Sequence, residues 1–446
     1  MIFNWMLKGD LRTVKARKNI IVSIGLKIID SITYFLLVPA TIKFLNPYEF
    51  GVWLALSSIL MWIDSFDIGL GNGMRNKLAL CLAKDDTKRA RIYVSTTFFM
   101  LIALVTGFVL IYTLARPFID WNSILNAPVT QVPHLNEIVY LSFILYCINF
   151  IFKIIGSVYL AMQLSAVNNF LIVSGHVLSL FIIFILSEFT EGTLLLTAVI
   201  YTSAPLIVYL IAYPITFKIK YKSLSPSIKC IDKGCLGDLF NIGMHFFILQ
   251  ISGIVLFSLV NLLISHELGP ETVTQYSVSY RYYSIVLMCM NLILAPMWSA
   301  TTDAYAMGDM QWIQNTMAKI RRVLLIATVG IIFMTFASEW FYKIWVGSEV
   351  EIGISVSVPM AIYVWIIMCS LTYSNFLNGL GKLRLQMINT LCMAIVYLPF
   401  CYYLGSVFGL PGIIGGMCML NLSGFIFNYI QFNKIIKGTA EGIWDR

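Results

Sequence analysis

The chain has 446 residues, of which 59% are hydrophobic and only 12% are charged. So few charges could not cover the surface of a water-soluble protein of this length, which excludes a soluble globular enzyme. Apolar runs of roughly 20 residues recur along the whole sequence, and each is long enough to cross about 30 Å of hydrocarbon as a helix. The sequence therefore predicts an all-α polytopic membrane protein.

About twelve membrane-spanning helices are predicted, half of them in each half of the chain. In the first half they cover residues 18–44, 48–80, 91–115, 134–161, 166–188 and 192–218. In the second half they cover residues 237–265, 272–303, 319–345, 353–381, 385–408 and 411–437. Between them lies a polar, basic segment, so we expect an N-terminal lobe (1–218), a cytoplasmic linker (219–236) and a C-terminal lobe (237–446).

The two halves of the chain resemble each other. The segments Leu45-Asn46-Pro47 and Leu268-Gly269-Pro270 each lie in a short break between two long apolar runs, half the chain length apart. The same offset relates Asp86 to Asp309. An internal repeat of apolar helices predicts two pseudo-symmetric six-helix lobes around a central cavity, as in secondary transporters.

Lysine and arginine are distributed unevenly among the predicted loops. They concentrate before the first helix, around Lys84 and in the linker 219–236, whereas few lie at the opposite helix ends. Positive residues accumulate on the cytoplasmic side of membrane proteins, so both termini are predicted to be cytoplasmic. The net charge of +8 then reflects topology and anionic lipid, and nothing indicates a nucleic-acid partner.

Two predicted helices of the first half carry charges that are costly in lipid. Lys27 and Asp30 are three residues apart and share one helix face, and so do Asp64 and Asp67. Lys27 and Asp64 fall at similar depth, about 10 Å from the inner surface. An ion pair between these two side chains is plausible, and both a structural role and a role in the cavity remain open.

Basic and aromatic residues inside other helices are candidates for substrate binding. Arg281 stands between Tyr280 and Tyr282, and a guanidinium binds phosphate oxygens as a fork. The alternative is that Arg281 belongs to an aromatic belt and that its side chain extends to the membrane interface. Lys153 lies closer to the inner surface, where the same two interpretations hold. Together with Lys27, these residues form the predicted substrate-binding set.

Proton or ion coupling needs groups that change charge inside the membrane. The carboxylates of Asp30, Asp64 and Asp67 are the first candidates. His176 and His245 also lie in predicted helices, and histidine can carry protons near neutral pH. The alternative for each histidine is a structural hydrogen bond.

No metal, cofactor or catalytic motif is recognised. The nine cysteines lack the spacing of a zinc site. The glycine-rich run Gly69–Gly73 has no preceding strand and no P-loop lysine, so it does not indicate nucleotide binding. The sequence also lacks common hydrolase motifs, and it predicts a transporter with no cofactor and no metal, not an enzyme.

Two segments of the first half carry a family resemblance. The run from Phe66 to Lys77 contains Asp67, Gly69 and Arg75 in an order that resembles the inner end of the second helix in bacterial polysaccharide transporters. The run from Phe44 to Gly51 resembles the break after their first helix. With its helix number and two halves, the chain is similar over its whole length to the Wzx-type O-antigen or capsule repeat-unit flippases. These belong to the MOP superfamily, together with the MATE exporters.

The resemblance implies a MATE-like fold and a specific function. Such proteins move an undecaprenyl-diphosphate-linked oligosaccharide from the cytoplasmic to the outer leaflet of the bacterial inner membrane. The resemblance implies alternating access, a cationic cavity and coupling to an ion gradient, with a polysaccharide polymerase as a candidate partner. A monomer is expected, because each lobe finds its counterpart within the chain. The family has no motif that fixes the cavity residues, so those assignments depend on the residues alone.

Two other functions remain open. A MATE-like exporter of small organic cations should have an acidic cavity, and the basic residues within the helices argue against it. A membrane polymerase or ligase usually has a large outer loop with functional arginines. The longest predicted outer loop here, residues 116–133, contains a single arginine, Arg116.

Overall fold

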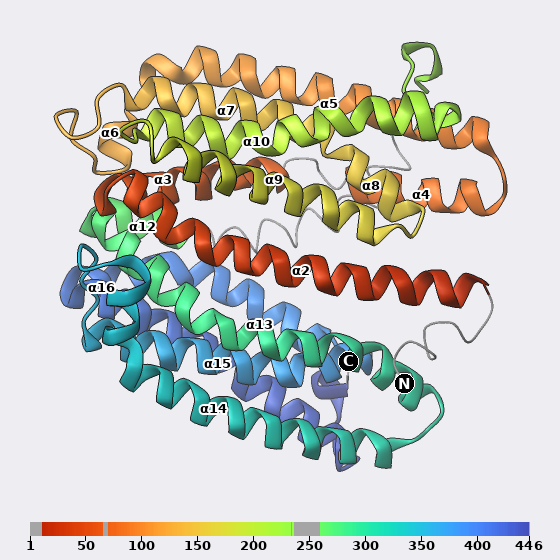
Figure 1. Ribbon diagram of the computed structural model, residues 1–446. Helices are drawn as coiled ribbons and strands as arrows, with labels where there is room; N and C mark the ends of the chain where they lie inside the picture. Colours follow the sequence, from red (N-terminus) through yellow and green to blue (C-terminus); the bar gives the residue numbers. More distant parts are fainter. Residues whose placement is uncertain (1–10, 66–69, 233, 236–258, 446) are drawn as a thin grey trace. The chain divides into compact units, whose positions relative to one another are not determined.

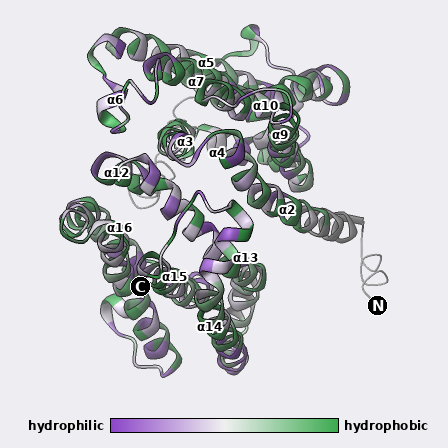
Figure 2. Ribbon diagram, turned by 60° about the vertical axis from the view of Figure 1, so that its left-hand side comes forward, coloured by the Kyte–Doolittle hydropathy of each residue, from purple (hydrophilic) through white to green (hydrophobic). Residues whose placement is uncertain are grey.

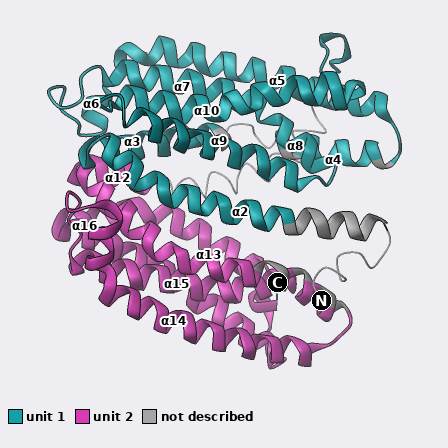
Figure 3. Cartoon of the chain, viewed as in Figure 1, with its two compact units in different colours: residues 1–254 teal, residues 255–446 magenta. Residues whose placement is uncertain are grey.

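The computed structural model describes residues 11–65, 70–232, 234–235 and 259–445, and these form helices joined by turns and loops (Figure 1). Contacts between Cα atoms divide the chain into unit 1, Met1–Ile254, and unit 2, Val255–Arg446 (Figure 3). Each unit is described by itself.

Unit 1 is built from long helices interrupted by short ones. Its α-helices are α2 (Leu11–Phe44), α3 (Pro47–Leu60), α4 (Leu70–Ala83), α5 (Thr87–Ala115), α6 (Trp121–Ile124), α7 (Leu135–Phe152), α8 (Ile154–Ala161), α9 (Ser165–Leu186) and α10 (Leu194–Pro214). Shorter turns follow several of them, namely η1 (Met61–Ser65), η2 (Arg116–Phe118), η3 (Ile215–Lys220), η4 (Lys222–Leu224) and η5 (Ile228–Cys230).

Unit 2 consists of fewer and longer helices in its described part. They are α12 (Leu259–Leu268), α13 (Pro270–Ala306), α14 (Met310–Val346), α15 (Ile354–Gly379) and α16 (Arg384–Ile436), followed by the turn η7 (Gly442–Asp445). Helix α16 spans two of the predicted helices and contains a break at Gly409, whose φ of 65° and ψ of −148° are not helical. Glycine adopts this positive φ without steric cost.

Eight described segments are long and apolar enough to cross a membrane. They are Val22–Phe44, Thr87–Phe118, Leu135–Ala161, Ser165–Leu186, Leu194–Lys220, Met310–Val346, Ile354–Gly379 and Arg384–Ile436. Figure 2 shows hydrophobic residues along the helices of both units. The prediction of an all-helical, multi-pass membrane protein is confirmed, whereas the count of twelve helices stays a prediction.

Two of the predicted helices are interrupted in the structure, and a third is only partly described. The 3₁₀ turn η1 interrupts the predicted helix 48–80, and a turn at Lys153 separates α7 from α8 within the predicted helix 134–161. Of the predicted helix 237–265, the structure describes only the end, where α12 begins at Leu259. Neither of the first two breaks contains a proline or a glycine, which are the usual sequence signals for a helix end.

The internal repeat has counterparts in local structure. Helices α3 and α13 each begin at a proline, Pro47 and Pro270, which is a favoured first residue of a helix. Asp86 and Asp309 are the N-caps of α5 and α14, and their carboxylates accept hydrogen bonds from Arg89 N and Trp312 N, each at 2.9 Å. Both caps have nearly the same backbone angles, φ −83° with ψ 75° or 69°. These matched helix starts support a common origin of the two halves.

Candidate functional site

Helix α2 packs against α9 and α10 within unit 1. Four buried side chains form a hydrophobic cluster between these helices, namely Leu37, Phe44, Ile183 and Ile200. Full burial of such a side chain stabilises the folded state by about 1.5–3 kcal/mol in water, but inside a membrane the gain comes mainly from close packing. The cluster fixes the C-terminal part of α2 and thereby the position of the polar residues that precede it on this helix.

Two hydroxyl contacts hold α2 at either end of this packing. Ser23 Oγ lies 3.2 Å from Ser165 Oγ of α9, and Thr41 Oγ1 lies 2.7 Å from the Tyr201 hydroxyl of α10. Hydrogen bonds between membrane helices contribute about 0.6 kcal/mol on average. The Ser23 contact pairs the beginnings of the α2 and α9 spans, so these two helices run parallel.

Asp30 and His176 meet between these two contacts. Asp30 Oδ1 lies 2.6 Å from His176 Nδ1, with side chains that are 31% and 29% exposed. The ring of Tyr34, one helical turn from Asp30, meets the imidazole edge-on at 5.3 Å and 84°. We call these three residues the Asp30 cluster. The pair joins a carboxylate, which accepts hydrogen bonds, to an imidazole, which can donate or accept them, in a partly exposed position.

The structure brings together two of the five predicted coupling residues. Asp30 and His176 form the pair, whereas Asp67 and His245 lie outside the described residues. Asp64 lies in the turn η1, where the structure describes its backbone but not its side chain. The predicted pair of Lys27 with Asp64 therefore stays a prediction.

The predicted substrate-binding cations occupy different elements. Lys27 is exposed on α2, three residues before Asp30. Lys153 is partly exposed at the junction of α7 and α8, where its backbone N–H donates to Asn149 O at 2.9 Å. Arg281 is partly exposed on α13 in unit 2. All three side chains thus retain exposed surface within their own units.

The two tyrosines beside Arg281 point to different neighbours. The ring of Tyr280 stacks on Tyr276 at 6.2 Å and an angle of 5°, and its centre also lies 6.4 Å from that of the Tyr363 ring of α15. Tyr282 is only 4% exposed, and its hydroxyl donates to Met334 O of α14 at 3.0 Å. Residues two positions apart on a helix point about 200° apart, so the rings of Tyr280 and Tyr282 do not form one stacking surface around Arg281.

Sequence reasoning missed two features of the Asp30 cluster. The contact between Asp30 and His176 joins residues that are 146 positions apart, and no local pattern predicts such a pairing. Tyr34 could have been found, because residues four apart share one face of a helix.

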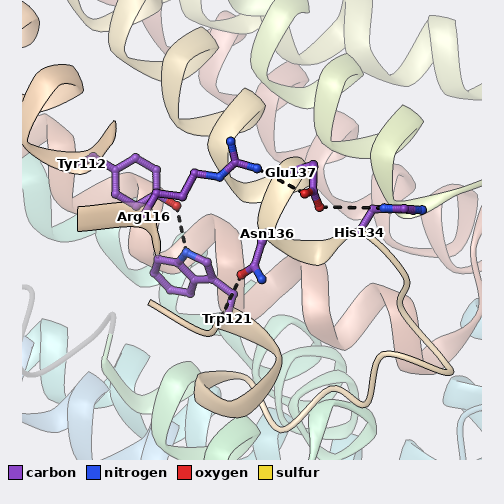
Figure 4. Close-up of polar contacts among 6 residues, drawn as sticks. All are labelled: Tyr112, Arg116, Trp121, His134, Asn136 and Glu137. Atoms are coloured by element: carbon purple, nitrogen blue, oxygen red, sulfur yellow. Dashed lines mark hydrogen bonds and ion pairs between the residues drawn. The ribbon is translucent and has the colours of Figure 1, made fainter. Parts of the chain in front are cut away.

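A second polar cluster lies in the loop region after α5, within unit 1 (Figure 4). Arg116 Nη2 lies 3.2 Å from Glu137 Oε1, and its guanidinium carbon is 4.7 Å from the centre of the Tyr140 ring. Trp121 Nε1 donates to the Tyr112 hydroxyl at 2.8 Å. The one arginine of this loop is therefore engaged in local contacts that connect the loop to α7.

Among the residues that the structure describes, no group of three or more His, Cys, Asp or Glu side chains could hold a metal ion. The described ion pairs consist of two partners or share a single carboxylate, as His134 and Arg116 share Glu137.

Comparisons with known proteins identify both a family and a fold. A family model described as a polysaccharide biosynthesis protein matches residues 16–301. A candidate O-antigen transporter of Salmonella typhi is 21% identical over 430 residues, which cover 92% of this chain and 94% of that protein.

Solved structures of MATE transporters share the fold of this chain. An inward-facing multidrug resistance MATE family transporter of the MOP superfamily has a TM-score of 0.67 at 15% identity, covering 94% of this chain and 96% of that one. An outward-facing MATE transporter has a TM-score of 0.58 at 14% identity, covering 98% of both chains. The MATE-like fold is thereby confirmed.

Proposed function

The chain belongs to the polysaccharide biosynthesis protein family, and from this premise we propose that it is a flippase for lipid-linked oligosaccharides. It is a membrane transporter with a MATE-like fold, not an enzyme. The proposed substrate is an undecaprenyl-diphosphate-linked repeat unit, which moves from the cytoplasmic to the outer leaflet of the bacterial inner membrane. The observation that carries the proposal is the nearly full-length similarity to a candidate O-antigen transporter.

Lys27, Lys153 and Arg281 are proposed to neutralise the diphosphate during transfer. A diphosphate cannot cross bare hydrocarbon without a large desolvation penalty, and cations inside the protein offset that penalty. Tyr280 is proposed to contact the sugars, since aromatic rings offer an apolar face with a polar edge. Tyr282 is retained in the proposed substrate-binding set, and its hydroxyl bond to Met334 O joins α13 to α14.

Coupling to an ion gradient is assigned to the Asp30 cluster. Protonation of Asp30 removes a negative charge and weakens its charge-assisted bond to His176. The contact between α2 and α9 then differs in strength between the two protonation states, and such a difference can bias a conformational equilibrium. Asp64, Asp67 and His245 are retained as further proposed coupling residues.

The proposal includes an architecture and a topology. Twelve helices form two six-helix lobes, residues 1–218 and 237–446, which alternate their access around a central cavity. The linker 219–236 and both termini lie in the cytoplasm. The protein acts as a monomer, and a polysaccharide polymerase is its candidate partner.

Deletion of the gene, followed by a leaflet assay for lipid-linked repeat units, tests this function. We expect repeat units to accumulate on the cytoplasmic side while surface polymer is lost. Arg281→Ala and Lys27→Ala should each reduce rescue, whereas Lys343→Ala, which removes a cation near the end of α14, serves as the matched control. Surface polymer at wild-type level for both variants, at equal expression, would exclude the assigned roles of the two cations.

A MATE-like exporter of small cations is the second candidate, because the solved structures with this fold include multidrug resistance transporters. Binding of a cationic drug to the purified protein, without binding of a polyprenyl diphosphate, would favour this function. Repeat units that reach the outer leaflet without the protein and stay unpolymerised would instead indicate a polymerase or ligase.

A further inference from the structure

Helices α2 and α9 form an apolar groove near the ends of their spans. It has a volume of about 530 Å³ and is lined by Leu36 and Lys43 of α2 and by Phe181 and Phe184 of α9, among other residues. Lys43 lies in the last turn of α2 and is exposed. We call this hollow the Lys43 groove.

A second groove lies at the opposite end of the same two helices. It has a volume of about 420 Å³, and its lining includes Val22 and Leu26 of α2, Phe170 of α9 and Lys220 at the end of η3. Lys220 is also exposed. We call this hollow the Lys220 groove.

The two grooves lie on one continuous apolar face. Residues seven apart fall on nearly the same side of a helix, about 20° apart per step. Two such series of exposed side chains connect the grooves, namely Val22, Ile29 and Leu36 on α2 and Phe170, Val177 and Phe184 on α9. At about 1.5 Å per residue, the helix from Val22 to Lys43 is roughly 30 Å long, which equals the thickness of the hydrocarbon core.

The charges distinguish this face from another apolar groove of the molecule. In unit 2, α14 and α15 enclose about 440 Å³ lined by Thr328, Phe336, Trp365 and other uncharged residues, with no charged side chain among its described lining. The Lys43 and Lys220 grooves each contain one lysine among their described lining residues. An apolar face of membrane thickness with a cation at both ends is complementary to a long hydrocarbon chain that carries phosphate at one end.

We propose that this face of α2 and α9 binds the isoprenoid chain of the substrate, an inference that rests on the proposed flippase function. Before transfer, the diphosphate lies beside Lys220 and the first isoprene units occupy the Lys220 groove. After transfer, the diphosphate lies beside Lys43 and the first isoprene units occupy the Lys43 groove. The chain reverses its direction in the membrane, and the same face accommodates it in both orientations.

Photocrosslinking of the full-length protein in vesicles tests this proposal. A benzoylphenylalanine residue replaces, one at a time, three exposed phenylalanines, namely Phe170 in the Lys220 groove, Phe181 in the Lys43 groove and Phe336 in the α14–α15 groove. The vesicles contain phosphatidylethanolamine, phosphatidylglycerol and undecaprenyl diphosphate. Mass spectrometry identifies the lipid that is attached at each position.

We expect undecaprenyl diphosphate to be captured at positions 170 and 181 at least about fivefold more than at position 336, as the free energy of a lysine beside an anionic headgroup implies. Lys43→Ala should reduce capture at position 181 and leave position 170 unchanged. Lys220→Ala should have the opposite pattern. This local dependence separates a headgroup contact from a general loss of folding, which would lower capture at all three positions.

Two outcomes would overturn the proposal. One is capture of phospholipids alone at positions 170 and 181, which would make the face an ordinary lipid contact. The other is equal capture at position 336, or capture that does not depend on the lysines. The leaflet assay decides the function separately, because a protein that flips the substrate without specific capture retains its function and loses only this binding face.

Discussion

One polar contact between α2 and α9 in unit 1 differs in chemistry from two contacts between α13 and α14 in unit 2. Where α2 meets α9, a carboxylate and an imidazole lie 2.6 Å apart, Asp30 against His176. Where α13 meets α14, neutral hydroxyl groups make the contacts, as with Tyr283, which donates to Thr335 Oγ1 at 3.2 Å, and Tyr282, which donates to Met334 O at 3.0 Å. The first contact contains a carboxylate and an imidazole, whereas these examples of the second contain only hydroxyl and carbonyl groups.

This difference suggests a division of labour between the two sets of helices. A contact between two ionisable groups suits a protonation-dependent switch, which is the role proposed for the Asp30 cluster. A contact made of tyrosine and threonine hydroxyl groups suits a structural role instead. Variants of the α2–α9 contact should therefore alter transport, whereas variants of the Tyr283 contact and of the α13–α15 packing should alter stability.

The largest effect is expected from Asp30→Asn. The variant keeps the shape of the side chain and a hydrogen bond to His176, but it can no longer exchange a proton. We expect gradient-driven flipping to fall by about a hundredfold, near the upper end of typical coupling free energies. Flipping in vesicles with and without an imposed proton gradient measures this effect.

The partner residue provides the control for this prediction. His176→Gln should give a similar loss, and the double variant should lose no more than either single variant, because both act through one contact. Independent, additive losses would show that the two residues do not act together. Gradient-dependent transport by Asp30→Asn would remove this pair from the coupling mechanism.

A large effect on stability is expected where α13 and α15 approach closely. A Cβ atom added at Gly379 would lie 2.6 Å from Thr301 Cβ and 2.8 Å from Trp298 O. Such overpacking destabilises a protein by about 2 kcal/mol, so Gly379→Ala should lower the unfolding temperature in detergent. At Gly25 on α2, by contrast, nothing lies within 4 Å of an added Cβ, and Gly25→Ala should unfold at or above the wild-type temperature. An unchanged unfolding temperature for Gly379→Ala would contradict the close packing.

A smaller effect is expected from the hydroxyl contacts of α13. Tyr283→Phe removes the bond to Thr335 and should lower the free energy of unfolding by about 1 kcal/mol while flipping per folded molecule stays unchanged. Tyr403→Phe, at a ring that is 65% exposed, should leave stability unchanged. Thermal unfolding combined with the leaflet assay separates the two readouts. A strong loss of flipping by the folded Tyr283→Phe protein would contradict the proposal that this contact affects stability and not transport.

The sequence predicted the all-helical, multi-pass character of the fold, because the length of an apolar run is enough to predict a membrane-spanning helix. The break at Gly409 falls between two predicted helices, where glycine and proline mark it. The break at Lys153 was missed, because neither residue type stands there. Asp30 and His176 were predicted singly as ionisable residues in apolar helices, but their pairing depends on how α9 packs beside α2, which no local pattern contains.

The smallest effect concerns a thiol outside the membrane, in the segment after η5 of unit 1. This segment is joined to α5, where Asp232 N donates to Thr96 Oγ1 at 3.1 Å. Burial raises the pKa of the Cys235 thiol above its ordinary value, and the neighbouring Asp232 carboxylate raises it further. At any given pH, less of this thiol is therefore ionised than of an ordinary cysteine, so its reaction with bromobimane should need a higher pH. Asp232→Asn removes a negative charge, lowers the pKa of the Cys235 thiol and should speed the reaction about threefold near pH 8.

The measurement uses a Cys230→Ser background, with peptide mapping to assign the label. Because burial is the larger cause, the reaction should still be slower than that of a free thiol. If Cys235 of the Asp232→Asn variant instead reacted as fast as a free thiol, this segment would not be packed on α5. The hydrogen bond from Asp232 N to Thr96 Oγ1 would then not hold the segment in place.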